Sequence, residues 1–595
     1  MASPAFGTFG PLIGVIYVSG SQCRFLIYST KNAEVLTFHD RKMRQIVHNA
    51  GWLEYDPAEI WNNAQECIET AFKNLVILEI NPYDLIAIGI CSHRGTTILW
   101  DKETGNPLYN AIGWNDCRTA PLLKTMLDNV NYDVNYLRHK SGLPLSTCFS
   151  AFKIKWLQEN VPGVSTAIEK GTCLFGTIDT WILWNLTGAN ISGVHSTDVT
   201  NAGYTSLMNV HTLQWDTKLC KFFRIPMQIL PRIRSNSEIY GYVIGGVLNG
   251  LPIAGCIGEQ SAALLGQLQT KAGQNACIID DSCFVLVNTG EALIESSNGL
   301  LSLVAYKLGP KSPTCYSLEG AISNAGSTVN WLKQGLRIST EINSNDNVVE
   351  VLNTFLGETS MISSCSSGML NAEFGLAAKR SEITFVPAFH GLYAPYWRYD
   401  TRGVLLGLTS QTTAENVTQA AYESTGFQIY EVLDAMKRDT PTWNRQNNKE
   451  RLIFSGEYAE NNAFVQFIAD IVGCLLERPQ TTSPAGLGTM ICAGITMNVV
   501  SLLQAKVMYP PPVDAFSPTT TVSRREQLYK RWNYAVKKCL NWNNYATYEE
   551  DLELFAQRDN DPNLPIRRSI PGSIYITTSF LLLLVANFLR GRQVS

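Results

Sequence analysis

The order of apolar and polar positions along the chain predicts two similar halves. In residues 14–30, two apolar runs flank a Ser-Gly-Ser-Gln turn, which predicts a strand, a tight turn and a second strand. Residues 276–290, ACIIDDSCFVLVNTG, repeat this pattern. After each hairpin, strand-like apolar runs alternate with helix-like segments, as is typical of an α/β fold. We therefore expect two related α/β halves with a ligand cleft between them.

Individual residues predict where helices and domains begin. Asp56 can cap a helix whose first position is Pro57. Residues 251–268, LPIAGCIGEQSAALLGQL, predict a strand, a glycine turn and then a helix. We place a first domain at residues 12–250 and a second domain at residues 251–542.

The C-terminal region predicts a membrane-spanning helix at residues 569–589, which contain no charged residue. About 20 apolar residues rising about 1.5 Å each can cross a hydrocarbon core of about 30 Å. A buried or interfacial terminal helix is the alternative. The charged residues 543–568 predict a linker, and the polar, serine-rich residues 341–370 predict a surface insertion.

The N-terminus has no basic region before its first apolar run, so we expect no secretory signal. With a C-terminal span, the functional part of the chain would face the cytosol, as in a tail-anchored protein. The net charge of −4 and the 16% charged residues give no indication of nucleic-acid binding. The 15 cysteines are scattered without a CxxC pair, which favours buried thiols in a reducing compartment over disulfides or a zinc site. We predict no metal-ligating residues.

Nine further segments stand out, in order, between residues 12 and 542: GWLEYDPAEIW (51–61), RGTTILWDKETGNPLYNAIGW (94–114), FKIKWLQENV (152–161), LFGTIDTWILWNLTG (174–188), VHTLQWD (210–216), GEQSAALLGQ (258–267), CFVLVNTGE (283–291), FVPAFHGLYAPYWRYDTRGVLLGLT (385–409) and FVQFIADIVGCLLERP (464–479). Together they resemble the FGGY carbohydrate-kinase family and, within it, the glycerol kinases. The resemblance implies two actin-like ATPase (ribonuclease H-like) domains. These would close on ATP, Mg²⁺ and glycerol or a similar small polyol, and form glycerol 3-phosphate.

The same resemblance implies a location and an assembly. Some animal members of the family also carry a hydrophobic tail that holds them on the outer mitochondrial membrane. We therefore predict attachment to that membrane through residues 569–589, with the cytoplasm as the alternative location. The sequence leaves the endoplasmic reticulum open as the membrane concerned. The sequence leaves open whether the protein forms a homo-oligomer.

For the polyol, the resemblance implies that Arg94 grips two neighbouring hydroxyls and that Trp114 and Phe284 pack against the carbon backbone. Gln260 would also bind the substrate, and Glu259 would accept the proton of the reacting hydroxyl. Ordinary core packing is the alternative role for the two aromatic residues. A simple helix cap is the alternative role for Glu259.

Two positions depart from the family pattern at this polyol site. Gly95 replaces an acidic residue, and Cys148 replaces a tyrosine. Each change removes a group that could bind a hydroxyl, at about 1–3 kcal/mol per missing bond. The sequence therefore predicts weaker binding of glycerol, or a different alcohol.

For the nucleotide, the resemblance implies binding residues in both hairpins and beyond them: Ser21, Arg24, Asp281, Gly326, Gly456 and Asn461. Three departures follow. Tyr17 or Ile16 stands where the family has an aspartate, Asp280-Asp281-Ser282 replaces a Gly-Thr-Gly turn, and Glu457 replaces a glycine. Carboxylates repel a triphosphate, and the missing aspartate would normally organise Mg²⁺. Either Asp280 or Asp281 takes over metal binding from that aspartate, or the Asp-Asp-Ser sequence is an ordinary surface turn.

Two functions fit this combination of an intact scaffold and altered motifs. The first is an ATP-dependent glycerol kinase. The second is an impaired or inactive homologue that acts as a membrane-anchored binding or scaffold protein.

Overall fold

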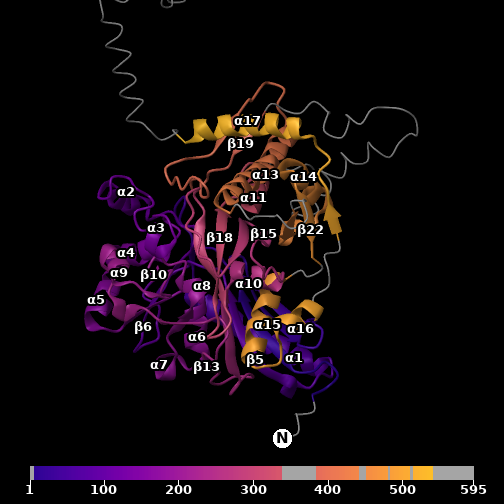
Figure 1. Cartoon of the computed structure of the whole chain (residues 1–595). Coiled ribbons are helices and arrows are strands. Elements are labelled where there is room, and N and C mark those ends of the chain that lie inside the picture. Colours follow the sequence, from indigo (N-terminus) through magenta and orange to yellow (C-terminus); the bar gives the residue numbers. More distant parts are fainter. Residues whose placement is uncertain (1–5, 338–382, 441–450, 480–482, 509–513, 541–595) are drawn as a thin grey trace, which may run out of the picture. The chain divides into compact units, whose positions relative to one another are not determined.

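The predicted hairpin at the N-terminus opens a six-stranded sheet in the computed structural model, which describes residues 6–337, 383–440, 451–479, 483–508 and 514–540 (Figure 1). β1 (Leu12–Val18) pairs antiparallel with β2 (Gln22–Ser29), so the first hairpin is confirmed. The sheet order is β13-β14-β5-β1-β2-β3. Its other strands are β3 (Val35–Lys42), β5 (Leu85–Ser92), β13 (Gly241–Tyr242) and β14 (Pro252–Gly258).

The second predicted hairpin opens a seven-stranded sheet in the order β17-β18-β16-β15-β21-β22-β23. The hairpin is formed by β15 (Asn275–Ile279) and β16 (Cys283–Gly290). The remaining strands are β17 (Leu301–Lys307), β18 (Thr314–Ile322), β21 (Arg451–Ser455), β22 (Leu475–Arg478) and β23 (Asp514–Phe516).

The two sheets share one topology. In the first, β3, β2 and β1 are antiparallel neighbours, and β5 and β14 then continue parallel to β1. In the second, β18, β16 and β15 are antiparallel, and β21 and β22 continue parallel to β15. The prediction of two related α/β halves is therefore confirmed, and the repeated topology is the one expected for actin-like domains.

Helices cover the sheets and connect their strands. The longer ones are α1 (Pro57–Ile77), α2 (Ala120–Asp128), α4 (Ser150–Asn160), α5 (Pro162–Lys170), α6 (Ile178–Leu186), α9 (Thr217–Phe223), α10 (Glu259–Gly266), α11 (Gly326–Gln334), α13 (Ala414–Asp439), α14 (Asn462–Val472), α15 (Pro484–Thr496), α16 (Leu502–Met508) and α17 (Val522–Cys539). The short helices are α3 (Arg138–Ser141), α7 (Ala189–Ser192) and α8 (Val199–Ala202), with 3-10 turns η1 (Pro82–Asp84), η2 (Met227–Ile229) and η3 (Glu457–Glu460). Short strand pairs complete the fold: β4 (Glu54–Tyr55) with β7 (Ala111–Ile112), β6 (Ile98–Asp101) with β8 (Cys173–Gly176), β9 (Ser196–Asp198) with β12 (Arg232–Arg234), β10 (Met208–Asn209) with β11 (Gln214–Trp215), and β19 (Thr384–Val386) with β20 (Val404–Leu406).

The helix start predicted at residue 57 is confirmed. The Asp56 carboxylate accepts a hydrogen bond of 2.8 Å from the Ala58 backbone N–H, and Pro57 occupies the first helical position. This arrangement satisfies one of the free N–H groups at the helix start, and Pro57 has no N–H to satisfy. The helix covers one face of the first sheet through its contacts with β2 and β3.

The first sheet is covered on both faces. Along β1, Ile13 and Val15 belong to one hydrophobic core, whereas Leu12 and Ile16 belong to another. Helix α15 contacts β14, β5 and β1, so the chain returns from the second half to cover the first sheet. In Figure 1 the orange α15 lies beside strand β5 of the first sheet. A strand buried on both faces is expected to be apolar throughout, as β1 is.

Strand β14 lies in the first sheet, although residues 252–258 follow the predicted boundary after residue 250. It pairs in parallel with β5, because its buried apolar run needs a partner strand and cover on both faces. The first sheet therefore extends at least to residue 258. In the described part of the chain, no helix combines the length and apolar character needed to span a membrane. The predicted insertion (341–370), linker (543–568) and membrane helix (569–589) lie outside the described residues.

Candidate active site

A cavity of about 470 Å³ lies at the ends of the two hairpins. Residues from both sheets line it, so the predicted cleft between the halves is present. The lining includes all but two of the residues that the sequence assigned to substrate, proton transfer or nucleotide: Ser21, Arg24, Arg94, Trp114, Glu259, Gln260, Asp281, Phe284 and Gly456.

Strand register brings the cavity side chains together. Tyr17 on β1 lies directly opposite Arg24 on β2, and Ile278 on β15 lies opposite Phe284 on β16. All four side chains line the cavity. Of the two residues considered for the missing aspartate, Tyr17 therefore faces the cavity, because successive side chains of a strand point to opposite faces.

A buried ion pair joins the two halves beside the cavity. Arg94 follows β5, and its Nη2 donates to both carboxylate oxygens of Glu319 on β18, at 2.7 and 2.8 Å. Arg94 Nε donates to Gln260 Oε1 at 2.8 Å. Burial alone would lower the pKa of Arg94, but the Glu319 carboxylate raises it. Glu319 was not identified from the sequence. Its only signal there is a single charged residue in the otherwise uncharged stretch 314–322.

Glu259 is held by two donors at the start of α10. The Tyr17 phenol donates to Glu259 Oε1, and Gln260 Nε2 donates to Oε2 at 3.1 Å. Gly258 is the N-cap residue, and it makes no side-chain cap. Both carboxylate oxygens of Glu259 therefore bond side chains that line the cavity. Burial raises the pKa of the Glu259 carboxyl, whereas the bonds from Tyr17 and Gln260 lower it.

The side of the cavity formed by the β15–β16 turn and η3 is acidic. Asp280, Asp281, Glu457 and Glu460 all line it, and Arg24 is the basic side chain of the first hairpin that faces it. Asp280 accepts a hydrogen bond of 2.7 Å from the Glu457 backbone N–H. Burial is the main cause that raises the pKa of Asp280, to about 7. The β15–β16 turn therefore places the carboxylates of Asp280 and Asp281 at the cavity wall.

Family models identify the fold and the class of chemistry. The model for the N-terminal domain of the FGGY family of carbohydrate kinases matches residues 12–266, and the model for the C-terminal domain matches residues 275–497. The chain belongs to the FGGY family of carbohydrate kinases. The family prediction is thereby confirmed, and by resemblance this FGGY kinase is a phosphotransferase.

Curated proteins and solved structures point to the glycerol kinases within that family. This FGGY kinase is similar to glycerol kinase of Brucella anthropi, with 37% identity over 530 residues that cover 89% of this chain and 99% of that protein. It is also 37% identical over 571 residues to a probable glycerol kinase of Dictyostelium discoideum, covering 89% and 99% of the two chains. The crystal structure of Plasmodium falciparum glycerol kinase with ADP matches with a TM-score of 0.73 and 31% identity, over 90% of this chain and 99% of that one.

Two predicted nucleotide residues of this FGGY kinase do not line the cavity. A Cβ atom on Gly326 would lie 2.2 Å from the Tyr458 ring, so the glycine makes room for that side chain. Asn461 caps helix α14, where its side chain accepts a hydrogen bond of 3.0 Å from the Phe464 N–H. In this structure both positions therefore have packing or capping roles.

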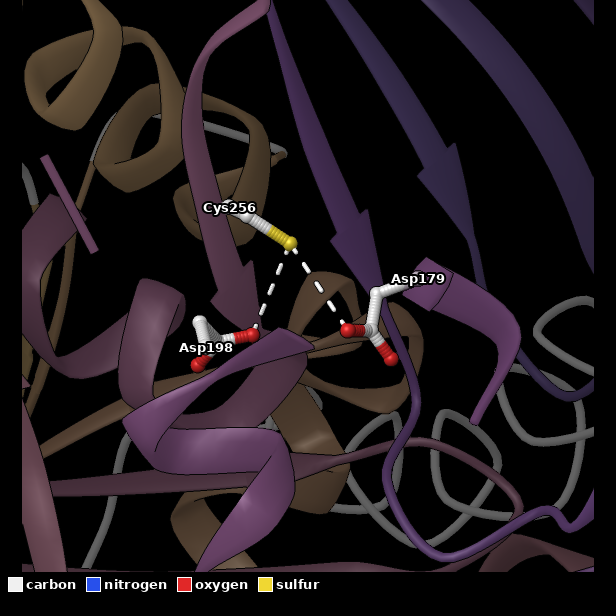
Figure 2. A group of neighbouring side chains, drawn as sticks. All are labelled: Asp179, Asp198 and Cys256. Carbon is white, nitrogen blue, oxygen red and sulfur yellow. Dashed lines mark hydrogen bonds between the residues drawn. The ribbon is translucent and has the colours of Figure 1, made fainter. Parts of the chain in front are cut away.

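Three buried side chains form a separate cluster, shown in Figure 2: Asp179, Asp198 and Cys256. Their ligand-type atoms lie within 4.8 Å of one another. Both carboxylates already accept hydrogen bonds, Asp179 from the Thr197 hydroxyl at 2.7 Å and Asp198 from Asn201 Nδ2 at 2.6 Å. Hydrogen bonds from neighbouring side chains of the protein therefore hold both carboxylates in place.

This cluster also supports the strand that leads to Glu259. Asp198 accepts a hydrogen bond of 2.7 Å from the Thr200 N–H and one from the Thr200 hydroxyl. The Thr200 hydroxyl in turn accepts a hydrogen bond of 2.8 Å from the Gly258 N–H. The backbone directly before Glu259 is therefore fixed to the first half.

The Tyr17→Phe variant tests how Glu259 is tuned. Without the phenol, the Glu259 carboxylate loses a hydrogen bond that favours its charged form, so its pKa should rise. The acid limb of the kcat/KM profile should therefore move to higher pH. The control variant is Tyr28→Phe. It removes a buried phenol on β2 that has no described contact with Glu259. An acid limb that stays in place for Tyr17→Phe would contradict this role.

The Asp179→Asn variant tests the buried cluster. Burial and then the Asp198 carboxylate raise the pKa of Asp179 to about 7, whereas an unfolded aspartate titrates near pH 4 (about 3.9). The folded state therefore binds this proton more tightly, and the stabilisation is full below about pH 4 and is lost as the pH rises through 7. Urea unfolding should show the stability difference between wild type and variant falling over that range.

Asp216 provides the control for this titration, because the fold lowers the pKa of its carboxyl instead of raising it. Burial would raise its pKa, but hydrogen bonds from Asn209 and from the start of α9 lower it to about 2. The Asp216→Asn difference should therefore be constant above about pH 4 and fall only as the pH drops towards 2. Equal pH profiles for Asp179→Asn and Asp216→Asn would show that the cluster does not carry the proton.

Proposed function

We propose that this FGGY kinase transfers the γ-phosphate of ATP to glycerol or a similar small polyol, with glycerol 3-phosphate and ADP as products. One observation carries the proposal. The Glu259 carboxylate bonds Gln260, the partner of Arg94, on one side and Tyr17 of strand β1 on the other, and all four residues line one cavity. We assign the Arg94–Gln260 side to the polyol and the side of the first hairpin to the phosphates.

The polyol side has flat apolar walls and polar groups between them. The rings of Trp114 and Phe284 lie 5.5 Å apart, and both side chains line the cavity with Arg94 and Gln260. Apolar faces suit the C–H groups of a small polyol, and the guanidinium and amide suit its hydroxyls.

The reaction needs a base that accepts one proton. A substrate hydroxyl oxygen attacks the γ-phosphorus, the bond to the β–γ bridging oxygen breaks, and ADP leaves with that electron pair. The hydroxyl proton goes to Glu259. A carboxylate can accept about four hydrogen bonds, and Tyr17 and Gln260 account for two of those described. Glu259 therefore retains acceptor capacity for the substrate.

ATP would enter as its Mg²⁺ complex. The Arg24 guanidinium and the Ser21 hydroxyl can contact phosphate, whereas Asp280 and Asp281 fit a divalent cation better than bare phosphate oxygens. When bound, Mg²⁺ would neutralise charge on the phosphates and on these carboxylates. On this basis the acidic turn favours the metal complex over free ATP.

The same acidic turn supports a second candidate function, a homologue that binds the polyol without turning it over. Asp281 accepts a hydrogen bond of 3.0 Å from Asn330 Nδ2, and Asp280 is bonded to the Glu457 N–H. Both carboxylates thus have protein partners of their own. If these partners keep Mg²⁺ away, the carboxylates of this turn repel the triphosphate.

Glycerol-dependent ADP formation by the purified full-length chain tests the proposal, with Glu259→Gln as the base variant. We expect kcat to fall at least about 100-fold in Glu259→Gln, while glycerol still binds in calorimetry. Glu259→Asp is the matched control, because it keeps a carboxylate and should retain more activity than Glu259→Gln.

The outcomes separate the two candidate functions. Wild-type turnover that Glu259→Gln leaves unchanged would contradict the assignment of the base. Glycerol binding by the wild type without any ADP formation would favour the non-catalytic homologue.

A further inference from the structure

Glu457 lines the cavity with an exposed carboxylate that has no hydrogen-bond or ion-pair partner among the described residues. The carboxylates of Glu259, Asp280 and Asp281 at the same cavity each accept a hydrogen bond from the protein. The Glu457 carboxylate is therefore available to a molecule that enters the cavity.

The Glu457 carboxylate lies within electrostatic range of both hairpins. Burial and the Asp281 carboxylate raise the pKa of the Glu457 carboxyl, whereas the Arg24 guanidinium of the first hairpin lowers it. Glu457 and Arg24 both line the cavity, yet neither a hydrogen bond nor an ion pair joins these two described side chains. A ligand that lies between the two hairpins can therefore reach the carboxylate.

The backbone that carries Glu457 is held in place by its neighbours. The Glu457 N–H donates to Asp280 Oδ1 at 2.7 Å. Gly456 has a φ of +106°, and a Cβ atom there would lie 2.3 Å from the Ile279 carbonyl oxygen. A larger residue would be strained at position 456, so residue 457 carries the first side chain after β21.

The order of the strands places Glu457 on the far side of the β15–β16 turn from the polyol. In the second sheet β16, β15 and β21 are neighbours. Phe284 of the polyol wall lies on β16, Asp280 follows β15, and Glu457 follows β21. Adjacent strands lie about 4.8 Å apart, so β21 lies roughly 10 Å from β16. The ribose of ATP follows the phosphates on the side away from the transferred group, and Glu457 lies on that side.

A carboxylate suits the ribose, because the sugar offers two neighbouring hydroxyl groups as donors. Hydrogen bonds to a charged acceptor are roughly twice as strong as those between neutral groups. In dinucleotide-binding folds, an aspartate or glutamate binds a ribose hydroxyl in this way. A carboxylate that made no such contact would only repel the triphosphate. Removal of the carboxylate therefore has opposite effects on ATP affinity in the two cases.

We infer that the Glu457 carboxylate accepts hydrogen bonds from the ribose hydroxyls of the phosphate donor, so that the site takes ribonucleotides in preference to deoxyribonucleotides. The glycine that the family has at this position offers no side chain for such a contact. The inference rests on the proposed function, since it assumes that ATP occupies this cavity.

Calorimetry on the full-length wild type tests the preference without any substitution. ATP, 2′-deoxy-ATP and 3′-deoxy-ATP would each be titrated in the presence of Mg²⁺. At least one of the two deoxynucleotides should bind about tenfold more weakly than ATP, because a hydrogen bond to a charged acceptor is lost. Equal binding of all three nucleotides would overturn the inference.

The Glu457→Ala variant tests whether this residue makes the contact. ATP should bind about tenfold more weakly than it binds the wild type, and the difference between ATP and the deoxynucleotides should disappear. Glu457→Gln keeps a neutral acceptor, so its affinity for ATP should fall between those of the wild type and Glu457→Ala. Tighter binding of ATP by Glu457→Ala would mean that the carboxylate only repels phosphate, and it would overturn the inference.

Glu460→Ala is the matched control. It removes the same charge from the other end of η3, where Glu460 is also exposed and lines the cavity. This variant should change the affinities for ATP and the deoxynucleotides by the same factor, so that their ratio stays that of the wild type. A ratio that both alanine variants abolish equally would attribute the preference to the charge of the turn and would contradict a contact by Glu457.

The same titrations separate this inference from the proposed function. Glycerol affinity and Tm should match the wild type in both alanine variants, which shows that the fold and the polyol side are intact. Wild type that phosphorylates glycerol yet binds the three nucleotides equally would overturn the inference alone. Wild type that binds none of the three nucleotides with Mg²⁺ would overturn the inference and the proposed function together.

Discussion

The buried ion pair between Arg94 and Glu319 is the interaction on which the arrangement of the site depends. It joins the first half of the chain to the second across 225 positions of sequence, and Glu319 is fully buried. Removing two charges from water costs several kcal/mol per ion, so such a pair is stable only when both groups are well bonded. Each partner therefore fixes the other, and the polyol side of the cavity takes its shape from the pair.

From this pair a chain of contacts leads to the reacting group. Arg94 bonds Gln260, Gln260 bonds Glu259, and Glu259 accepts from Tyr17. The same guanidinium packs on the Tyr204 ring. The proposed base thus depends on the ion pair for its position, and a change at Arg94 is expected to alter the environment of Glu259.

The sequence could predict what depends on local pattern. The hairpins, the Asp56 cap and the Glu259 helix start follow from nearby residues, and most of the predicted site residues meet at one cavity. Glu319 could not be found in this way, because its role arises only where β18 meets Arg94. Gly326 and Asn461 match family positions, yet here the glycine makes room for Tyr458 and the asparagine caps α14. The membrane helix at residues 569–589 stays a prediction.

A double-mutant cycle on the ion pair tests this account most directly. Urea unfolding would be measured for wild type, Arg94→Met, Glu319→Leu and the double variant. We predict that each single substitution costs about 3–5 kcal/mol, because it leaves one buried charge unpaired, and that the double variant costs clearly less than their sum. Costs that simply add would contradict the account, since they would show that the two charges do not depend on each other.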